Sequence, residues 1–206
     1  MYFSFIRYIN NYMKIAILGS GGREHAITFA VSKSKKIEKI FCIPGNAGTS
    51  EIAENISVDI NNFEILYKFL NQNDIMFVIV GPEQPLVDGI VDYLEKFDIK
   101  VFGPNKIASQ LEGSKIFTKN LCKKYKIPTA DFGVFQNKND TKKFLENTKY
   151  PIVIKADNLA SGKGVYICNN KKESHMAVEE IFDGKFGEAK NILVEEFLQG
   201  EEMSYF

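Results

Sequence analysis

The stretch KIAILGSGGREHA, residues 14–26, decides the expected fold, because a run typical of a buried β-strand leads directly into a glycine-rich turn and a helix-like segment. Further β-rich runs follow at residues 39–43, 76–80 and 100–102, separated by longer amphipathic segments. Strands separated by helical crossovers predict a parallel, doubly wound α/β sheet with right-handed connections. We therefore expect a Rossmann-like domain in the first half of the chain.

Each of these runs is followed at once by glycine or proline. The four turns are GSGG (19–22), PGNAG (44–48), GPEQP (81–85) and GP (103–104). Open parallel sheets bind their ligands at the carboxyl ends of the strands. The turns are therefore expected to converge on one crevice, although any one of them alone could be no more than a tight connection.

The first turn resembles a dinucleotide fingerprint but does not satisfy it. Glu24 stands where the third glycine is required, and no acidic residue occurs near residues 42–44, where a ribose-binding one is expected. NAD is therefore disfavoured. The turn can still bring backbone N–H groups and Arg23 close to an anion such as a sugar phosphate. His25, in the first helical turn, is interpreted as a packing or capping residue rather than a ligand.

A second region begins after QLEGSK, residues 110–115. We expect one helix from Lys106 to about Lys126, stopped by Pro128, with the domain boundary between Lys115 and Pro128. Hairpins are expected to follow.

The central hairpin of this region consists of a strand at 151–157, the loop NLASGKG at 158–164 and a strand at 165–168. A P-loop is excluded because Asp157 replaces its first glycine, Gly164 replaces its Ser or Thr, and a strand follows instead of a helix. The pattern indicates a glycine-rich flap whose amides could cover nucleotide phosphates. A plain solvent-exposed hairpin is the alternative.

The spacing around this flap supports a nucleotide site. Lys155 lies on the first strand of the hairpin, Lys115 lies forty residues earlier, and a strand at 191–194 follows. The segment after that strand suits adenine at a strand edge and a carboxylate on ribose hydroxyls. The alternative is an acidic surface turn whose charges are solvated.

Composition limits the partners. The chain has 206 residues, 45% hydrophobic and 25% charged, with 26 basic and 26 acidic side chains, so it has no global positive field for nucleic acid or an anionic membrane. Its three cysteines lack a CxxC spacing and suit buried thiols in a reducing compartment. No apolar run reaches the roughly 18 residues of a membrane span, and residues 1–12 lack the features of a secretory signal. We expect a cytoplasmic protein that acts on small molecules and whose fold begins at Met13.

Nine motifs in collinear order resemble the glycinamide ribonucleotide synthetase family of the ATP-grasp superfamily over residues 13–206. They are LGSGGREHA, PGNAGT, IVGPEQPLVDG, FGP, QLEGSK, IPTA, PIVIKAD, GKGV and VEEFLQGEE. The resemblance implies a pre-ATP-grasp substrate domain at 13–114, an α+β ATP-grasp lid at 115–194, and the hinge and start of the large ATP-grasp domain at 195–206. It also implies an amino-terminal half that is inactive alone. Asn158 and Ser161 replace the family's glycine and alanine, which affects only the expected mobility of the lid.

The resemblance further implies a ligase of purine synthesis that joins glycine to 5-phospho-β-D-ribosylamine through a glycyl phosphate. It implies ATP and Mg²⁺ or Mn²⁺ as cofactors, metal ligands beyond Phe206, no catalytic side chain in this part, and a monomer at full length. ATP-binding residues would be Lys115, Lys155, Ser161, Gly162, Lys163, Gly164, Glu195, Glu196, Phe197, Leu198 and Glu202. Substrate-binding residues would be Gly21, Gly22, Arg23 and Glu83.

Two alternatives remain at this point. A biotin-carboxylase-like or formate-using ATP-grasp ligase would share the lid and hinge, but is not expected to combine GGREHA, PGNAGT and QLEGSK. Alternatively, the two domains could bind nucleotide or a partner protein without catalysis. Titration with ATP and with a phosphoribosylamine analogue would separate these possibilities.

Overall fold

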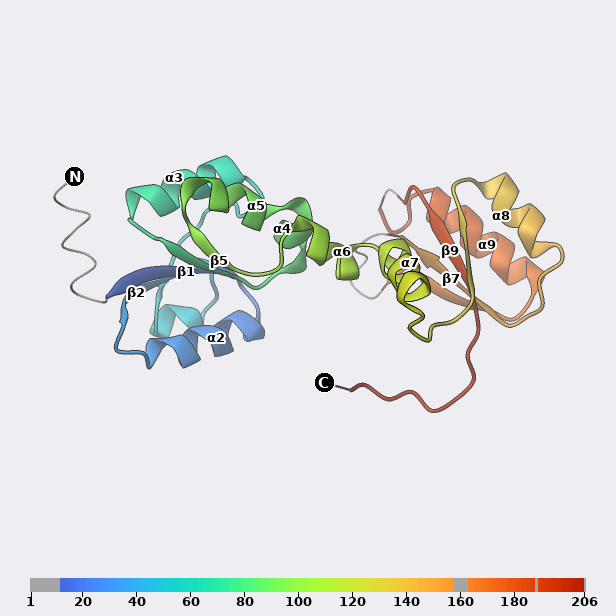
Figure 1. The fold of residues 1–206 in the computed structure, drawn as a ribbon, viewed down its shortest axis with the longest axis horizontal. Coiled ribbons are helices and arrows are strands. Elements are labelled where there is room, and N and C mark those ends of the chain that lie inside the picture. The colour runs from blue at the N-terminus through green and yellow to red at the C-terminus, as the bar shows by residue number, and fades with distance from the viewer. Residues whose placement is uncertain (1–11, 158–162, 188, 206) are drawn as a thin grey trace. The chain divides into compact units, whose positions relative to one another are not determined.

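The computed structural model describes residues 12–157, 163–187 and 189–205. Internal contacts divide the chain into two compact units, Met1–Ser109 and Gln110–Phe206. Each unit has a sheet of its own, parallel in the first and antiparallel in the second (Figure 1). The expected α/β class, a parallel-sheet domain followed by a smaller α+β domain, is confirmed.

The first sheet has the strand order β3-β2-β1-β4-β5, the order of a doubly wound fold. Every neighbouring pair is parallel; for example, Ile17 lies opposite Cys42 on one side and Ile79 on the other. The strand bounds are β1 Met13–Gly19, β2 Ile37–Pro44, β3 Glu54–Asn55, β4 Phe77–Val80 and β5 Lys100–Phe102. The four predicted strands are present, and β3 was missed because two residues carry no pattern.

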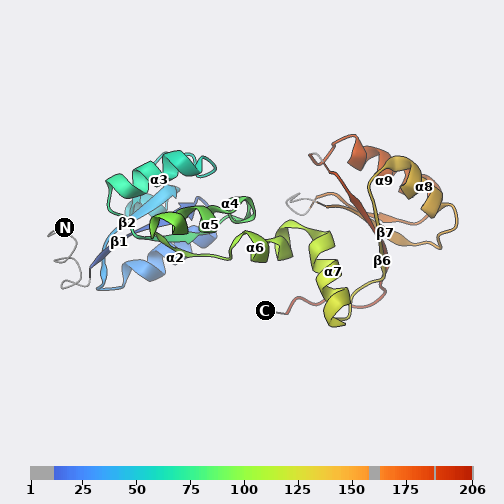
Figure 2. The ribbon, with the colours of Figure 1, turned by 45° about the horizontal axis from the view of Figure 1, so that its top comes forward.

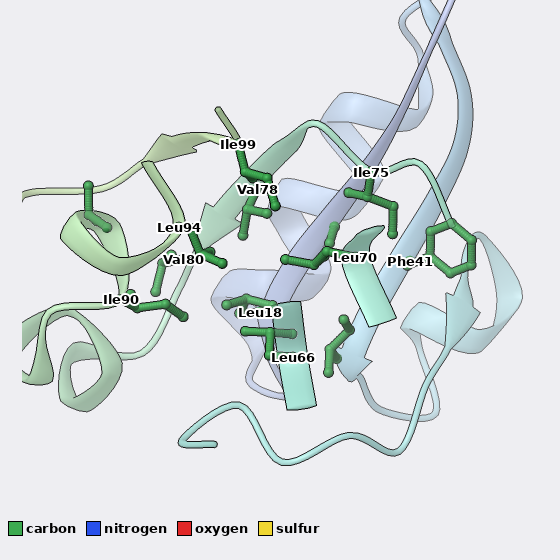
Figure 3. Close-up of a cluster of buried hydrophobic side chains, with 13 residues drawn as sticks. Leu18, Phe41, Leu66, Leu70, Ile75, Val78, Val80, Ile90, Leu94 and Ile99 are labelled. Carbon is green, nitrogen blue, oxygen red and sulfur yellow. The ribbon is translucent and has the colours of Figure 1, made fainter. Parts of the chain in front are cut away.

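Helices cover both faces of this sheet (Figure 1). One face packs on α3 and α5 in the cluster that Figure 3 shows, where Leu18 and Val78 of the strands meet Leu66 of α3. The other face packs Ile17 and its neighbours against α2. Burial on both faces explains the continuous apolar runs in the central strands β1, β2 and β4. The helices are α2 Gly22–Ser32, α3 Phe63–Gln72, α4 Glu83–Asp88, α5 Ile90–Leu94 and α6 Lys106–Gly113, with 3₁₀ turns η1 Thr49–Glu51 and η2 Glu95–Phe97.

The second sheet has the order β6-β9-β7-β8 and is antiparallel throughout. Helices α8 and α9 lie side by side on one face (Figures 1 and 2) and bury Ile154, Val178 and Val194 there. The bounds are α7 Lys115–Tyr125, β6 Phe132–Phe135, α8 Lys138–Leu145, β7 Ile152–Ala156, β8 Val165–Cys168, α9 Lys171–Phe182 and β9 Ile192–Glu196. The predicted β7–β8 hairpin is confirmed.

The prediction of a single helix from Lys106 to about Lys126 was wrong, because the chain forms two helices that are separated at Ser114. Ser114 has an extended backbone, with φ −133°, and its hydroxyl accepts a hydrogen bond from Phe117 N. Such an N-cap begins a new helix. The contact division falls after Ser109, and the boundary at Lys115 stays a prediction.

The three cysteines are unbonded thiols, buried at Cys42 and Cys168 and partly buried at Cys122. Burial raises the pKa of Cys168 to about 11. Among the residues that the structure describes, none of the helices combines the length and the apolar composition that a bilayer crossing requires.

Candidate functional site

Three of the four predicted turns line one crevice of about 520 Å³ at the carboxyl edge of the parallel sheet. It lies where the strand order reverses between β1 and β4, the usual place for a ligand in such sheets. The turn at 103–104 is not among the lining residues, and the loop before α3 takes its place. The lining is Gly19, Ser20, Gly21, Glu24, Pro44, Val58, Asp59, Ile60, Asn61 and Pro82.

Arg23 and Glu83, both predicted substrate residues, contact each other at this crevice. The two terminal nitrogens of Arg23 each lie 3.2 Å from Glu83 Oε1, and one also donates to the carbonyl of Gly81. The hydrogen bond from Nε to Glu24, at 3.1 Å, is the main cause that raises the pKa of Arg23, with Glu83 contributing. The first and third turns are thus joined by one guanidinium.

Glu24 is the residue that sequence reasoning missed here. Its carboxylate is buried beneath the turn and accepts a 2.7 Å hydrogen bond from Gly21 N. A Cβ on Gly81 would lie 2.1 Å from Glu24 Oε1, so this position requires glycine. An anion near Gly21 must therefore compete with a carboxylate for that N–H, although the sequence alone predicts that the amides of this turn are open to a phosphate.

The second turn is tied to the first by Asn46. Its side-chain nitrogen donates to the carbonyls of Ser20 at 2.9 Å and Gly21 at 3.2 Å. His25 packs its ring against Gly48, with Cε1 2.9 Å from where a Cβ would stand. This position matches the packing role expected of His25. The Asn and Thr of PGNAGT, which form a local hydrogen-bonded turn, were the signal for Asn46.

A second site lies on the face of the antiparallel sheet opposite α8 and α9. Lys155 Nζ is 3.0 Å from Glu195 Oε1, and Lys115 Nζ donates to the carbonyl of Ala156 at 2.9 Å. Burial lowers the pKa of Lys115, and Asp157 opposes that effect. The two predicted phosphate-binding lysines are therefore brought together, next to the end of the strand that leads into the flap.

Lys119 is a third lysine of this face and was not predicted. Its Nζ lies 3.0 Å from Glu195 Oε2 and donates to Thr129 Oγ1 at 2.9 Å and to the carbonyl of Ala130 at 3.0 Å. The signal was its spacing, because residues four apart share one face of a helix and Lys115 is the other member. We call Lys115, Lys119, Lys155, Asp157 and Glu195 the lysine cluster.

The remaining predicted nucleotide residues are placed as follows. The carboxylate of Glu195 faces lysines, while Glu196 is exposed and accepts a hydrogen bond from Asp131 N at 3.0 Å. Lys163 is exposed, and Gly164, at φ +77°, closes the hairpin by accepting from Ala156 N. Phe197 is partly buried, and Leu198 and Glu202 are exposed. Ser161 and Gly162 lie outside the described residues. Contact of these residues with a nucleotide stays a prediction.

No group of three or more His, Cys, Asp or Glu side chains suited to a metal ion occurs within residues 12–157, 163–187 and 189–205. The described donor set therefore does not fit a bound divalent cation by itself.

Two family models match in direct succession. "Phosphoribosylglycinamide synthetase, N domain" matches residues 13–112, and "Phosphoribosylglycinamide synthetase, ATP-grasp (A) domain" matches residues 113–206. The chain belongs to the phosphoribosylglycinamide synthetase family. The resemblance drawn from the nine motifs is thereby confirmed, and the alternative of a different ATP-grasp ligase family was wrong.

Similar proteins point the same way. The chain is 44% identical to the phosphoribosylamine–glycine ligase of Clostridium acetobutylicum and 46% identical to that of Caldanaerobacter subterraneus, over 93% and 94% of its length. It covers 47% of each, so it spans about half the length of these relatives.

Solved structures agree with these matches. A phosphoribosylamine–glycine ligase from Thermotoga maritima is 32% identical, with TM-score 0.73, covering 92% of this chain and 45% of that one. A biotin carboxylase domain of 2-oxoglutarate carboxylase from Hydrogenobacter thermophilus, in complex with MgADP, has TM-score 0.72 over 91% of this chain and 45% of that one. At 21% identity it shows the fold alone.

Proposed function

We propose that this chain forms the amino-terminal half of an ATP-dependent ligase that joins glycine to 5-phospho-β-D-ribosylamine, giving glycinamide ribonucleotide, ADP and phosphate. The observation that carries the proposal is the unbroken succession of the two family models over residues 13–206. The relatives named phosphoribosylamine–glycine ligase support it. The lysine cluster would bind the nucleotide, and the crevice would bind the phosphoribosylamine.

The lysine cluster would hold the nucleotide. Lys115 and Lys155 would contact the phosphates, the flap that includes Lys163 and Gly164 would cover them, and residues 195–198 with Glu202 would face the adenosine. Ammonium groups beside phosphate oxygens form charge-assisted hydrogen bonds, which are about twice as strong as neutral ones. A structural neighbour from Hydrogenobacter thermophilus was solved with MgADP, which supports a nucleotide as a ligand in general.

The crevice would hold the phosphoribosylamine. Glu83 would meet its amine, and Arg23, already positioned by Glu24 and Glu83, would lie near its phosphate together with Gly21 and Gly22. The side chain of Glu83 is 41% exposed and that of Arg23 57%, so both are open to a substrate. Substrate binding would therefore replace part of the Arg23–Glu83 contact.

The reaction would proceed in two balanced steps. A carboxylate oxygen of glycine takes the γ-phosphoryl group and ADP leaves; the substrate amine then attacks the acyl carbon, loses a proton, and phosphate leaves as the amide forms. Such chemistry depends on positioning and on neutralising charge more than on a side-chain nucleophile. The cluster has three lysines and two carboxylates, so its formal charge is +1 toward the phosphates.

We place the ligands of the divalent ion, Mg²⁺ or Mn²⁺, beyond Phe206 and derive no step through it, because the described residues do not fit one. We further propose a cytoplasmic enzyme that is monomeric at full length. The balanced charge and the unbonded thiols support an intracellular protein with small-molecule substrates.

Calorimetric titration tests the proposal. The protein to use is this chain continued at Phe206 by the second half of the Clostridium acetobutylicum relative, called the complete enzyme below. It should bind ATP and, separately, a stable phosphoribosylamine analogue. Binding of neither ligand would favour a non-catalytic role, and binding of bicarbonate in place of the analogue would favour a carboxylase.

A further inference from the structure

We propose that Lys119 is a positioning residue of the nucleotide site, which acts through Glu195 to leave Lys155 free for phosphate. The inference rests on the proposed function, because it assumes that Lys155 meets the nucleotide. It concerns a residue for which no ligand contact was expected.

Lys119 cannot itself serve a ligand. An ammonium group has three N–H donors, and those of Lys119 face three acceptors: Glu195 Oε2, Thr129 Oγ1 and the carbonyl of Ala130. Its side chain is 11% exposed, whereas that of Lys155 is 27% exposed. Only Lys155 of this pair is therefore accessible to a phosphate.

Glu195 joins the two lysines through its two oxygens. Oε2 lies 3.0 Å from Lys119 Nζ and Oε1 lies 3.0 Å from Lys155 Nζ. The Oε1 contact lacks hydrogen-bond geometry, and this buried oxygen has no hydrogen-bond donor among the described residues. Glu195 therefore pairs with both ammonium groups at the same distance, and Lys155 is held at Oε1 by charge rather than by an oriented bond.

The charge balance follows from this arrangement. Of the other charged members, Asp157 accepts from Ile116 N and from the Ser114 hydroxyl, and Lys115 donates to a carbonyl. With Lys119 present, the negative charge of Glu195 is shared between two ammonium groups. Without Lys119, the whole charge would act on Lys155, and the cluster would lose its positive excess. Phosphate would then compete with a full carboxylate for Lys155.

Lys119 also connects two backbone segments, because it joins α7 to the segment leading into β6 and to β9. A purely structural role for this connection is the competing explanation. The two explanations differ in one respect. If charge matters, neutralising Glu195 should rescue the loss of Lys119; if only the connection matters, it should not.

The test measures the dissociation constant of ATP for the complete enzyme and its variants. We expect Lys119→Met to weaken ATP binding roughly tenfold, the effect of one charge-assisted contact. We expect Lys119→Met/Glu195→Gln to bind ATP within about threefold of Glu195→Gln alone. Lys119→Arg, which keeps the charge, should stay within about threefold of wild type. The matched control is Lys171→Met, which removes the exposed ion pair between Lys171 on α9 and Glu146 at the end of α8.

The measured ATP affinities distinguish a failure of this inference from a failure of the proposed function. Equal ATP affinity in wild type and Lys119→Met overturns the inference, as does a tenfold loss between Glu195→Gln and the double variant. If Lys119→Met does not fold, the comparison of Glu195→Gln with the double variant decides, because replacing both buried charges leaves neither unpaired. If the wild type does not bind ATP, the proposed function has failed, and this inference fails with it. If only the variants behave otherwise than expected, this inference alone fails.

Discussion

Glu24 shows most clearly what single residues do in this chain. It breaks the dinucleotide pattern, and its buried carboxylate occupies the space that Gly19 and Gly81 leave beside the turn. It also holds Arg23 through Nε. The sequence identified Arg23 as a candidate, because it directly follows a glycine-rich turn at a strand end, and the family resemblance implied Glu83. It did not identify Glu24 or Lys119, because their roles depend on partners distant in the chain, Gly81 and Glu195.

Replacing Lys155 tests the nucleotide assignment at the same scale. Lys155→Ala should weaken ATP binding by the complete enzyme about 10- to 100-fold, since charge-assisted hydrogen bonds contribute roughly 1.5 to 3 kcal/mol. Glu195 keeps its partner Lys119, so the variant should still fold. Lys163→Ala, which replaces an exposed side chain, should affect turnover more than affinity. Calorimetry gives the comparison, and equal ATP affinity in wild type and Lys155→Ala would remove Lys155 from the site.

Replacing Glu83 tests the crevice. Glu83→Gln should raise the KM for phosphoribosylamine roughly tenfold, as expected when one charge-assisted contact to an amine is lost. The KM for ATP should change less than about twofold, because Glu83 lies in the first unit and the lysine cluster in the second. Folding should be unaffected, since an exposed pair contributes about 0 to 1 kcal/mol.

Steady-state kinetics with each substrate varied in turn decides between sites. Glu64→Gln, which removes another exposed ion pair of the first unit, serves as the control. An effect of Glu83→Gln confined to ATP would contradict the crevice assignment.

At the scale of elements, strand positions were predictable and helix limits were not. The runs at 14–18, 39–43 and 100–102 lie in β-strands, and the run at 76–80 begins one residue before β4. Burial on both faces gives β1, β2 and β4 their apolar runs, whereas β5 is largely exposed. The break between α6 and α7 was missed, since a helical pattern continues across Ser114 and the cap depends on Asp157, 43 residues away. Strand β6 was missed because its four residues alternate only weakly in burial.

The cap at Ser114 gives a prediction about α7, the helix that carries Lys115 and Lys119. Ser114→Ala should lower the free energy of unfolding by about 1 kcal/mol, because Phe117 N loses its acceptor. Urea unfolding of the 206-residue chain measures the change. Ser57→Ala, at an exposed loop position, is the control and should change stability by less than about 0.5 kcal/mol. A change at Ser114 no larger than this control would show that Asp157 alone caps the helix.

At the scale of the whole molecule, the two-part organisation was predictable from the change of pattern after residue 115. Four strand–turn units precede it and a glycine-rich hairpin follows, and the structure has one sheet for each. The four turns predicted the crevice. In the structure, residues 58–61 line it in place of the last turn. These residues were not predicted, because their loop has no recognisable sequence pattern. Of the three lysines in the lysine cluster, Lys115 and Lys155 were predicted and Lys119 was not.

The proposal that this chain supplies part of an ATP-dependent ligase is tested most directly by a coupled assay for ADP. The purified 206-residue chain, free of host enzyme, should form no ADP from ATP, glycine and phosphoribosylamine, whereas the complete enzyme should do so only with both other substrates present. The reason is that the metal ligands that neutralise the transferring phosphoryl group are expected beyond Phe206. Glycine-dependent ADP formation by the 206-residue chain alone would contradict this division of roles, as would the absence of such turnover by a folded complete enzyme.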